Sequence, residues 1–305
     1  MSSVKTDWRG SFPAIMTPFT RDFDIDEKLF LENVELTVSE GNHGIIVGGH
    51  NGEAPMMTFE ERCRIVELAA KQVRGRIPLL TGTGGIDTRQ VIKLTRAVKD
   101  LGANGVMIEP PYYMTPQPSD VLVHYQAISD AVDIPIMAYN NPRRVGVDLT
   151  PDMMEKVAAI KNVVAMKDSS FNFTQCLETL SRVGDKIAIF IGPSFNFGLP
   201  GVVMGVAGYV DGIPQIMGNR AVQLFEASAR GDLKLAQEIQ WQAYRLGKVL
   251  FQAEGTFPAT VKDAMNLMGR PGGYPRPPLR PMTGAALERF KAGLASCGLL
   301  ARAAA

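Results

Sequence analysis

The sequence of 305 residues has few cysteines, few histidines and no excess of charge of either sign. Its three cysteines, Cys63, Cys176 and Cys297, are far apart, which excludes a disulfide framework and favours a reducing compartment. Lys and Arg total 32 against 31 Asp and Glu, so the basic excess of nucleic-acid-binding proteins is missing. No run of about 18 apolar residues is present to span a membrane. We therefore expect a cytoplasmic protein that binds neither nucleic acid nor membrane.

Metal and nucleotide sites also lack their usual signals. His43, His50 and His124 fall on three separate segments without the spacing of a zinc site. The glycines of Gly82–Gly85 lack the full G-x-G-x-x-G pattern and the acidic residue that follows it in dinucleotide-binding proteins. We expect no metal and no nucleotide cofactor.

Short apolar runs do recur along the chain at intervals typical of βα units. Each has four to six residues rich in Ile, Val and Met and is apolar at nearly every position, as in strands buried on both faces. The eight runs are Phe12–Met16, Gly44–Val47, Ile77–Leu80, Gly105–Ile108, Ile134–Tyr139, Val163–Met166, Ile187–Ile191 and Val206–Val210.

Amphipathic stretches with helix-capping residues separate these runs. Thr58 and Glu61 have capping-box spacing, and Thr150 precedes a proline at a first helical position. Eight βα units favour a (β/α)8 TIM barrel, and a doubly wound open sheet is the alternative. After Val210 only helical patterns follow. We predict a barrel over residues 1–218 and a C-terminal helical appendage over residues 219–305, packed on the barrel.

Lys167 stands out among the polar residues at the ends of the predicted strands, where barrel enzymes place their active sites. It follows Val163–Met166 without a break. Desolvation favours the neutral amine, which attacks a carbonyl to form a Schiff base. The alternative is a rim lysine paired with Asp168 or Glu109.

Other strand ends carry candidate partners for Lys167. Tyr139 closes its own apolar run, and its phenol is placed to relay a proton; the alternative is a barrel-lining tyrosine. The turn Gly48–Gly52 presents successive backbone N–H groups, which suit a carboxylate. Arg144 is a candidate for a second carboxylate, or else a solvated surface arginine.

Taken together, the strand ends resemble the dihydrodipicolinate synthase / N-acetylneuraminate lyase family, the Schiff-base, pyruvate-dependent class I aldolases. The resemblance runs over nearly the whole chain. It is carried by Gly10–Phe12, Thr17–Phe19, Gly49–Glu53, Gly82–Gly84, Pro111–Tyr113, Tyr139–Pro142, Lys167–Ser169 and Gly192.

The resemblance implies a role for each matching residue. Lys167 forms an imine with pyruvate or a longer 2-oxo acid, so that no other cofactor is needed, and Tyr139 shuttles the proton. The turn of Gly49, His50 and Asn51 holds the carboxylate. Tyr113 reaches into the site of a neighbouring subunit, as in a homotetramer built as a dimer of dimers.

This sequence departs from the synthases at His50 and Asn51, where they carry two threonines, the first of which relays protons. His50 is a candidate substitute because the ordinary pKa of histidine lies near neutrality. Arg144 matches the synthases' arginine for a distal carboxylate, and Asp211 and Ser169, with Ser170 and Phe195–Phe197, are further candidates for recognising the aldehyde.

Three hypotheses follow. The first is a lyase that makes or breaks a carbon–carbon bond between a 2-oxo acid and an aldehyde, as dihydrodipicolinate synthases or 4-hydroxy-2-oxoglutarate aldolases do. The second keeps the imine but acts as a dehydratase or deaminase of a sugar- or hydroxyproline-derived 2-oxo acid, with His50 as the added acid or base. The third is a non-catalytic protein that binds a 2-oxo acid.

Overall fold

The computed structural model describes residues 6–301. Residues 1–5 of the predicted barrel region and residues 302–305 of the predicted C-terminal appendage lie outside the described residues. Eight strands form one parallel sheet, in which β1 pairs with β8 and all other neighbours are consecutive along the chain. The strands are β1 (Gly10–Ser11), β2 (Ile45–Val47), β3 (Leu79–Gly82), β4 (Gly105–Ile108), β5 (Ile136–Asn140), β6 (Val163–Asp168), β7 (Ala188–Ile191) and β8 (Gly208–Tyr209).

The sheet closes on itself between its first and second strands. Ala14, which follows β1, pairs with Ile46 of β2 in a single parallel bridge. Beside it, the amide of Ile46 donates to the carbonyl of Pro13 at 2.9 Å. Both residues of β1 pair with β8 on the other side. The predicted (β/α)8 barrel is confirmed, and this closure excludes the open sheet.

Helices fill the intervals between the strands, and side chains at their first turns fix where several of them begin. Thr58 and Glu61 form the predicted capping box, and Asp87 and Thr150 each accept a backbone N–H. The helices are α1 (Glu27–Ser39), the 3₁₀ helix η1 (Ala54–Met56), α2 (Phe59–Val73), α3 (Thr88–Asp100), α4 (Pro118–Ala131), α5 (Pro142–Val145), α6 (Pro151–Val157), α7 (Phe173–Val183), α8 (Ser194–Val203), α9 (Pro214–Met217), α10 (Asn219–Ala229), α11 (Leu233–Gln252), α12 (Phe257–Leu267) and α13 (Gly284–Ser296).

Most strands differ from the predicted bounds by one or two residues at an end, and two regions differ more. The first strand lies at Gly10–Ser11 instead of Phe12–Met16. The helical stretch expected over residues 219–252 is divided into α10 and α11. Gly231 lies between them with φ of 79°, a left-handed conformation that ends a helix, and Asp232 caps α11 by accepting from the Leu235 amide.

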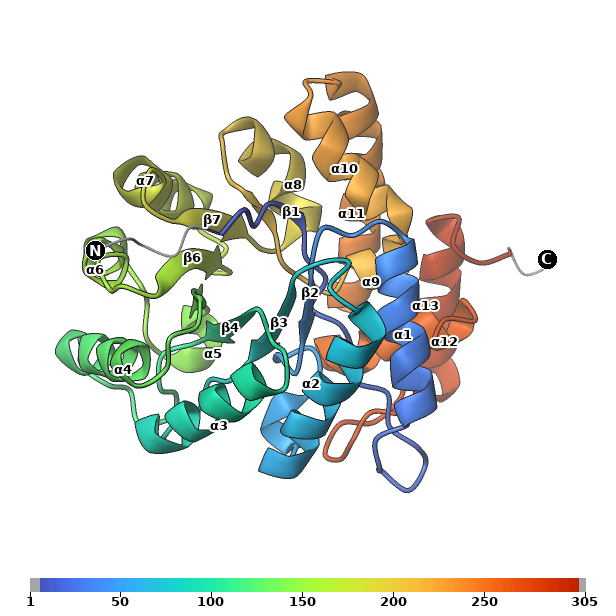
Figure 1. The fold of residues 1–305 in the computed structure, drawn as a ribbon. Coiled ribbons are helices and arrows are strands. Elements are labelled where there is room, and N and C mark those ends of the chain that lie inside the picture. The colour runs from blue at the N-terminus through green and yellow to red at the C-terminus, as the bar shows by residue number, and fades with distance from the viewer. Residues whose placement is uncertain (1–5, 302–305) are drawn as a thin grey trace.

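Apolar side chains pack on both faces of the sheet. Phe12, Met137 and Phe190 belong to the cluster inside the barrel, whereas Leu224 and Phe225 of α10 belong to the larger core between strands and helices. Helix α10 therefore packs against the strands and helices of the barrel. Helices α11, α12 and α13 share a separate apolar cluster, and Figure 1 shows them gathered at one side of the barrel. The division at residue 218 stays a prediction.

The carboxyl ends of the eight strands open at one mouth of the barrel. Tyr139 and Lys167 are each the last residue but one of their strands, so both lie at this mouth. Within residues 6–301, no helix has the length and apolar character needed to cross a membrane.

Candidate active site

Strands β5 and β6 bring Tyr139 and Lys167 side by side. The two residues are direct register partners, and neighbours in register point to the same face of a sheet. Nζ of Lys167 lies 4.1 Å from the centre of the Tyr139 ring. Lys167 is only 5% exposed, yet it forms no ion pair with any residue that the structure describes. A buried lysine without an acidic partner is unusual and is typical of a chemical role.

Asp168 is not the partner of Lys167, because successive side chains of a strand point to opposite faces. Its carboxylate accepts from the side chain of Asn140 at 3.2 Å and from the amide of Ser170 at 3.0 Å. These bonds bind Asp168 to the outer layer of the barrel. The interpretation of Lys167 as a rim lysine paired with Asp168 is therefore wrong.

A cavity of about 270 Å³ surrounds the Lys167 side chain. It contains seven of the predicted site residues: His50, Asn51, Tyr139, Arg144, Lys167, Ser169 and Asp211. The remaining lining residues are Asn141, Arg143, Phe171, Gly192, Pro193, Val210, Phe251 and Phe257. We call this space the lysine cavity.

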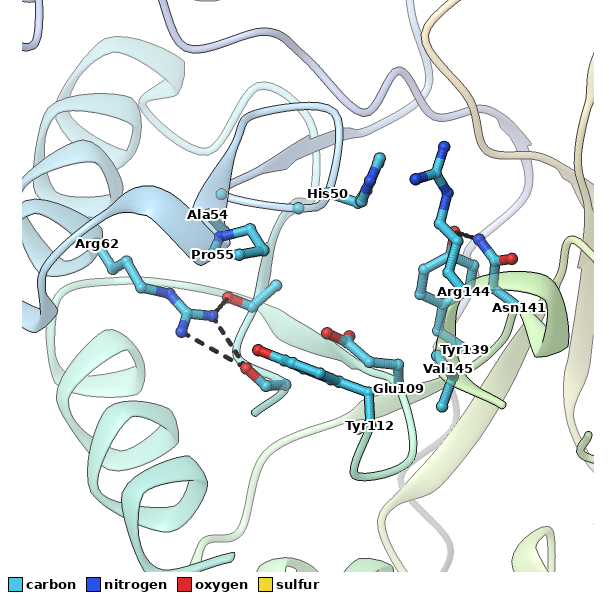
Figure 2. A pocket seen from close by; sticks show the side chains of 14 residues that line it. His50, Ala54, Pro55, Arg62, Glu109, Tyr112, Tyr139, Asn141, Arg144 and Val145 are labelled. Atoms are coloured by element: carbon cyan, nitrogen blue, oxygen red, sulfur yellow. Dashed lines mark hydrogen bonds between the residues drawn. The ribbon is translucent and has the colours of Figure 1, made fainter. Parts of the chain in front are cut away.

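A second cavity of about 250 Å³ adjoins the first and shares His50, Tyr139, Asn141 and Arg144 with it. Figure 2 shows this space, with Glu109 between Tyr112 and Tyr139 and with Arg62 at its edge. Gly49, another predicted site residue, lines this second cavity. The four shared residues form a common wall between the two spaces.

The turn after β2 places His50 in both cavities, Asn51 in the lysine cavity and Gly49 in the second cavity. Gly48 begins it with φ of 57°, and a Cβ at Gly82 would lie 2.5 Å from the Gly48 carbonyl oxygen, so the turn packs directly on β3. The Ala54 amide donates to the Gly49 carbonyl at 3.3 Å. The turn is thus fixed by backbone contacts, as a carboxylate-binding site requires.

Glu53 anchors the same turn to the C-terminal segment. Its carboxylate is buried in an ion pair with Lys262 of α12 and also accepts from the amide of Arg276 at 2.9 Å. Nζ of Lys262 donates to the Tyr274 carbonyl at 2.9 Å and lies 4.4 Å from the centre of the Phe19 ring. The C-terminal segment therefore holds the turn in place.

The imidazole of His50 is in an environment that disfavours its charged form. Burial, followed by the cations of Arg144 and Lys167, lowers its pKa to about 4. His50 is therefore neutral at pH 7. The sequence argument for His50 used the ordinary pKa near neutrality, and that premise is wrong here. A neutral imidazole at this position donates or accepts a hydrogen bond but supplies no positive charge.

Comparisons with known proteins place this geometry in a family. The model of the dihydrodipicolinate synthetase family matches residues 7–296. The chain belongs to this family. The predicted family is confirmed, and with it the predicted enzyme class, a lyase of that family.

Relatives and solved structures of the family cover almost the whole chain. It is 34% identical over 285 residues to the 4-hydroxy-tetrahydrodipicolinate synthase of Geobacter metallireducens, covering 93% of this chain and 97% of that protein. The corresponding enzyme of Methanoculleus marisnigri is also 34% identical, with 95% and 100% covered. The dihydrodipicolinate synthase structure from Thermotoga maritima has a TM-score of 0.90 at 30% identity, covering 97% and 100% of the two chains.

Asn141 is a site residue to which the sequence analysis gave no role. Its Nδ2 donates to the phenol oxygen of Tyr139 at 2.8 Å, and both side chains are buried. The backbone of Asn141 is fixed in turn, because its carbonyl accepts from the amides of Arg144 and Val145. The family motif from Tyr139 to Pro142 includes Asn141, but only the folded strand end reveals the hydrogen bond.

Two further residues belong to the site: Arg62, to which the sequence gave no role, and Glu109, which was named only as an alternative partner of Lys167. Glu109 lines the second cavity, and burial raises the pKa of its carboxyl group. A Cβ at Gly84 would lie 2.3 Å from this carboxylate, so glycine is what makes room for it. Arg62 donates to the carbonyl of Gly82 at 2.9 Å. No salt bridge joins Glu109 to Lys167 in the described chain.

Two predicted site residues have surroundings that the sequence did not indicate. Asp211 lines the lysine cavity, but one carboxylate oxygen accepts from the Ser194 amide and the other accepts from the Ile213 amide. Its hydrogen bonds join two loops. Tyr113 is 86% exposed and lines neither cavity of the described chain. Its contribution to a neighbouring subunit stays a prediction.

Proposed function

We propose that the protein forms an imine between Lys167 and pyruvate or a related 2-oxo acid, and makes or breaks a carbon–carbon bond to an aldehyde. The observation that carries this proposal is the buried Lys167 amine, without an acidic partner, against the ring of Tyr139 in a cavity. The family supports it. One solved relative, 29% identical, is the dihydrodipicolinate synthase of Acinetobacter baumannii complexed with pyruvate, with a TM-score of 0.90 and coverage of 96% and 100%.

In the first step, the amine of Lys167 attacks the C2 carbonyl carbon, and water leaves as the imine forms. The phenol of Tyr139 is the nearby group that transfers protons to and from the reacting atoms, and Asn141 holds its oxygen at 2.8 Å. Loss of a proton from the neighbouring carbon then gives the enamine. This nucleophile attacks the aldehyde carbon, and hydrolysis returns the free amine.

The carboxylate of the 2-oxo acid is assigned to the turn of Gly49, His50 and Asn51. Backbone N–H groups and the Asn51 amide supply donors, and neutral His50 adds one more. Arg144 lies at the wall shared by the two cavities, where its guanidinium suits a second carboxylate of a longer substrate. Ser169, whose amide donates to the Asn140 carbonyl at 2.8 Å, lines the same space.

The dehydratase or deaminase hypothesis rested on His50 as an added acid or base. Because its pKa is lowered to about 4, His50 is neutral at pH 7 and is not the charged acid that would protonate a leaving hydroxyl. This observation favours the carbon–carbon lyase over the dehydratase.

Borohydride trapping tests the proposal directly. The protein is incubated with pyruvate and borohydride and then analysed by peptide mass spectrometry. We expect an adduct on Lys167 with the mass of pyruvate less one oxygen. Lys167→Ala should lose it, and Lys186→Ala, at the opposite end of the barrel before β7, should keep it. The absence of an adduct with pyruvate and with longer 2-oxo acids would contradict the proposed chemistry.

We further propose that the protein works in the cytoplasm as a homotetramer, built as a dimer of dimers. The loop that carries Tyr113 supports this assembly. Tyr113 has φ of 68° and is almost fully exposed, and Met114 beside it is 69% exposed. Analytical ultracentrifugation of the wild type and Tyr113→Ser tests the assembly, and a monomeric wild type with full activity would contradict it.

A further inference from the structure

The mouth of the lysine cavity carries three phenylalanines from separate parts of the chain. Phe171 follows β6, Phe251 lies in the last turn of α11, and Phe257 begins α12; all three line the cavity. The ring centres of Phe171 and Phe251 are 6.2 Å apart, and those of Phe251 and Phe257 are 5.0 Å apart. These are the spacings of aromatic side chains in contact. We call these three residues the aromatic rim.

Phe171 holds its place in the rim despite an unfavourable backbone. Its φ is 65°, in the left-handed region that a residue with a Cβ rarely adopts. Its ring is nevertheless 36% exposed, so packing in the core does not explain the conformation. The guanidinium of Arg143 lies 5.2 Å from the ring centre, which orients the ring further. Strain of this kind at a cavity mouth indicates a functional constraint.

Phe251 packs against a buried aromatic ring on the side away from the cavity. Buried Phe195 lies with its ring centre 5.1 Å from that of Phe251. Gly247 of α11 makes room for Phe195, since a Cβ there would lie 2.2 Å from the ring. Phe251 itself remains 49% exposed at the cavity mouth. The rim is therefore a supported apolar surface beside the reactive amine.

Charge and size restrict what this surface can accept. Among the described residues that line the lysine cavity, Asp211 is the only carboxylate, and both of its oxygens accept backbone N–H groups. Three basic residues, Arg143, Arg144 and Lys167, line the same space, so their charge disfavours an aldehyde that carries an ammonium group. The cavity measures about 270 Å³, whereas a dry apolar cavity of about 150 Å³ already binds benzene. The space suits pyruvate together with one aromatic ring.

We propose that the aromatic rim binds the ring of an aromatic aldehyde and turns its formyl carbon toward the Lys167 enamine. This inference rests on the proposed function and specifies its second substrate. The enamine carbon gives its electron pair to the formyl carbon, and the formyl oxygen takes up the proton released when the enamine formed. Hydrolysis consumes the water released at imine formation. The product is a 4-aryl-4-hydroxy-2-oxobutanoate, for which pyruvate and the aldehyde supply every atom.

The test compares benzaldehyde with acetaldehyde as partners of pyruvate, by initial rates of aldol formation. We expect the wild type to show kcat/KM for benzaldehyde at least about 10-fold above that for acetaldehyde. Phe171→Gly and Phe251→Ala should each reduce this preference by about 10-fold, the order of magnitude of one aromatic contact. Phe23→Gly is the matched control, because Phe23 is also an exposed phenylalanine with positive φ, 70°, but lines neither cavity.

The outcomes separate this inference from the function on which it rests. If pyruvate is trapped on Lys167 but acetaldehyde reacts as well as benzaldehyde, the aromatic inference is overturned and the lyase stands. The same holds if the rim variants keep the preference, or if they change only the oligomeric mass, which would make the rim a contact between copies. If no imine forms, both proposals fail. Glycine suits a positive φ, so Phe171→Gly should keep its thermal stability, which separates lost preference from lost folding.

Discussion

Two buried lysines among residues 6–301 have opposite surroundings. Lys262 is fully enclosed and has an ion pair with Glu53, a carbonyl acceptor at Tyr274 and the ring of Phe19. Lys167 is also buried but lies in a cavity, with a tyrosine ring beside it and no acidic partner in the described chain. Burial alone thus does not mark a reactive amine. The distinguishing feature is whether the protein itself satisfies the charge.

Substitution of the two lysines should separate chemistry from stability, and the largest effect is expected at Lys167. Lys167→Ala removes the only group assigned to imine formation, so turnover should fall by roughly 10⁴-fold or more. Lys262→Met should still be trapped by pyruvate and borohydride at saturating pyruvate. Steady-state rates and peptide mass spectrometry check both variants, and an active Lys167→Ala would remove the basis of the comparison.

The free energy of unfolding should rank the two lysine substitutions in the reverse order, with the larger loss at Lys262. Lys262→Met leaves the buried carboxylate of Glu53 without its cation, which typically costs about 3–5 kcal/mol. The double variant Glu53→Gln with Lys262→Met should recover a substantial part of that loss, because it removes both buried charges. Urea unfolding gives the free energies, with Lys167→Met as the control expected to change the stability little. Equal losses in the two lysine variants would refute the distinction between them.

A smaller effect on turnover is expected from substitution of Asn141, which contacts Tyr139 beside Lys167. Asn141→Leu keeps a similar size but removes the hydrogen bond to the phenol oxygen. We expect kcat to fall by about 10- to 100-fold, with a smaller change in KM for pyruvate. Trapping of pyruvate on Lys167 should persist in this variant. A selective increase in KM would instead indicate that Asn141 serves binding.

The smallest effect concerns the titration of His50. Burial, Arg144 and Lys167 lower its pKa to about 4. In Lys167→Met one of the two cations is lost, so the pKa should rise while remaining below the ordinary value. Lys262→Met should leave it nearly unchanged. Nuclear magnetic resonance of the imidazole measures these pKa values. Equal values in the two variants would mean that the charge of Lys167 does not affect the pKa of His50.

The same shift gives a sign for the pH dependence of stability. Between pH 6.5 and 4 the unfolded chain binds a proton at residue 50 that the folded chain does not, so acid lowers the free energy of unfolding. The contribution of His50 between pH 7 and 5 is about 2 kcal/mol at most. His50→Asn should make the pH profile flatter in this window, as urea unfolding at several pH values would reveal.

The sequence was most informative where local pattern determines position. Strand periodicity and capping residues predicted the barrel, and the carboxyl ends of parallel strands necessarily meet, which identified Lys167 and Tyr139 as neighbours. The split between α10 and α11 was missed, because a helical pattern continues on both sides of Gly231.

Contacts between segments that are far apart in the sequence could not be predicted from local sequence patterns. Phe171 and Phe257 meet the same cavity only because α11 and α12 pack beside the barrel mouth. The sequence marked Asp211 as a candidate for recognising the aldehyde, but nothing in its pattern shows that a backbone amide donates to each of its oxygens. The hydrogen bond of Asn141 likewise depends on the final geometry of one strand end.

The contacts of Glu53 with Lys262 and Arg276 can form only late in synthesis on the ribosome. All eight strands have been translated once the chain reaches Tyr209. Glu53, at the end of the carboxylate-binding turn, meets its two anchors only after Lys262 and Arg276 have also emerged. A nascent chain that ends between residues 209 and 262 therefore contains all eight strand segments but lacks both anchors of the turn.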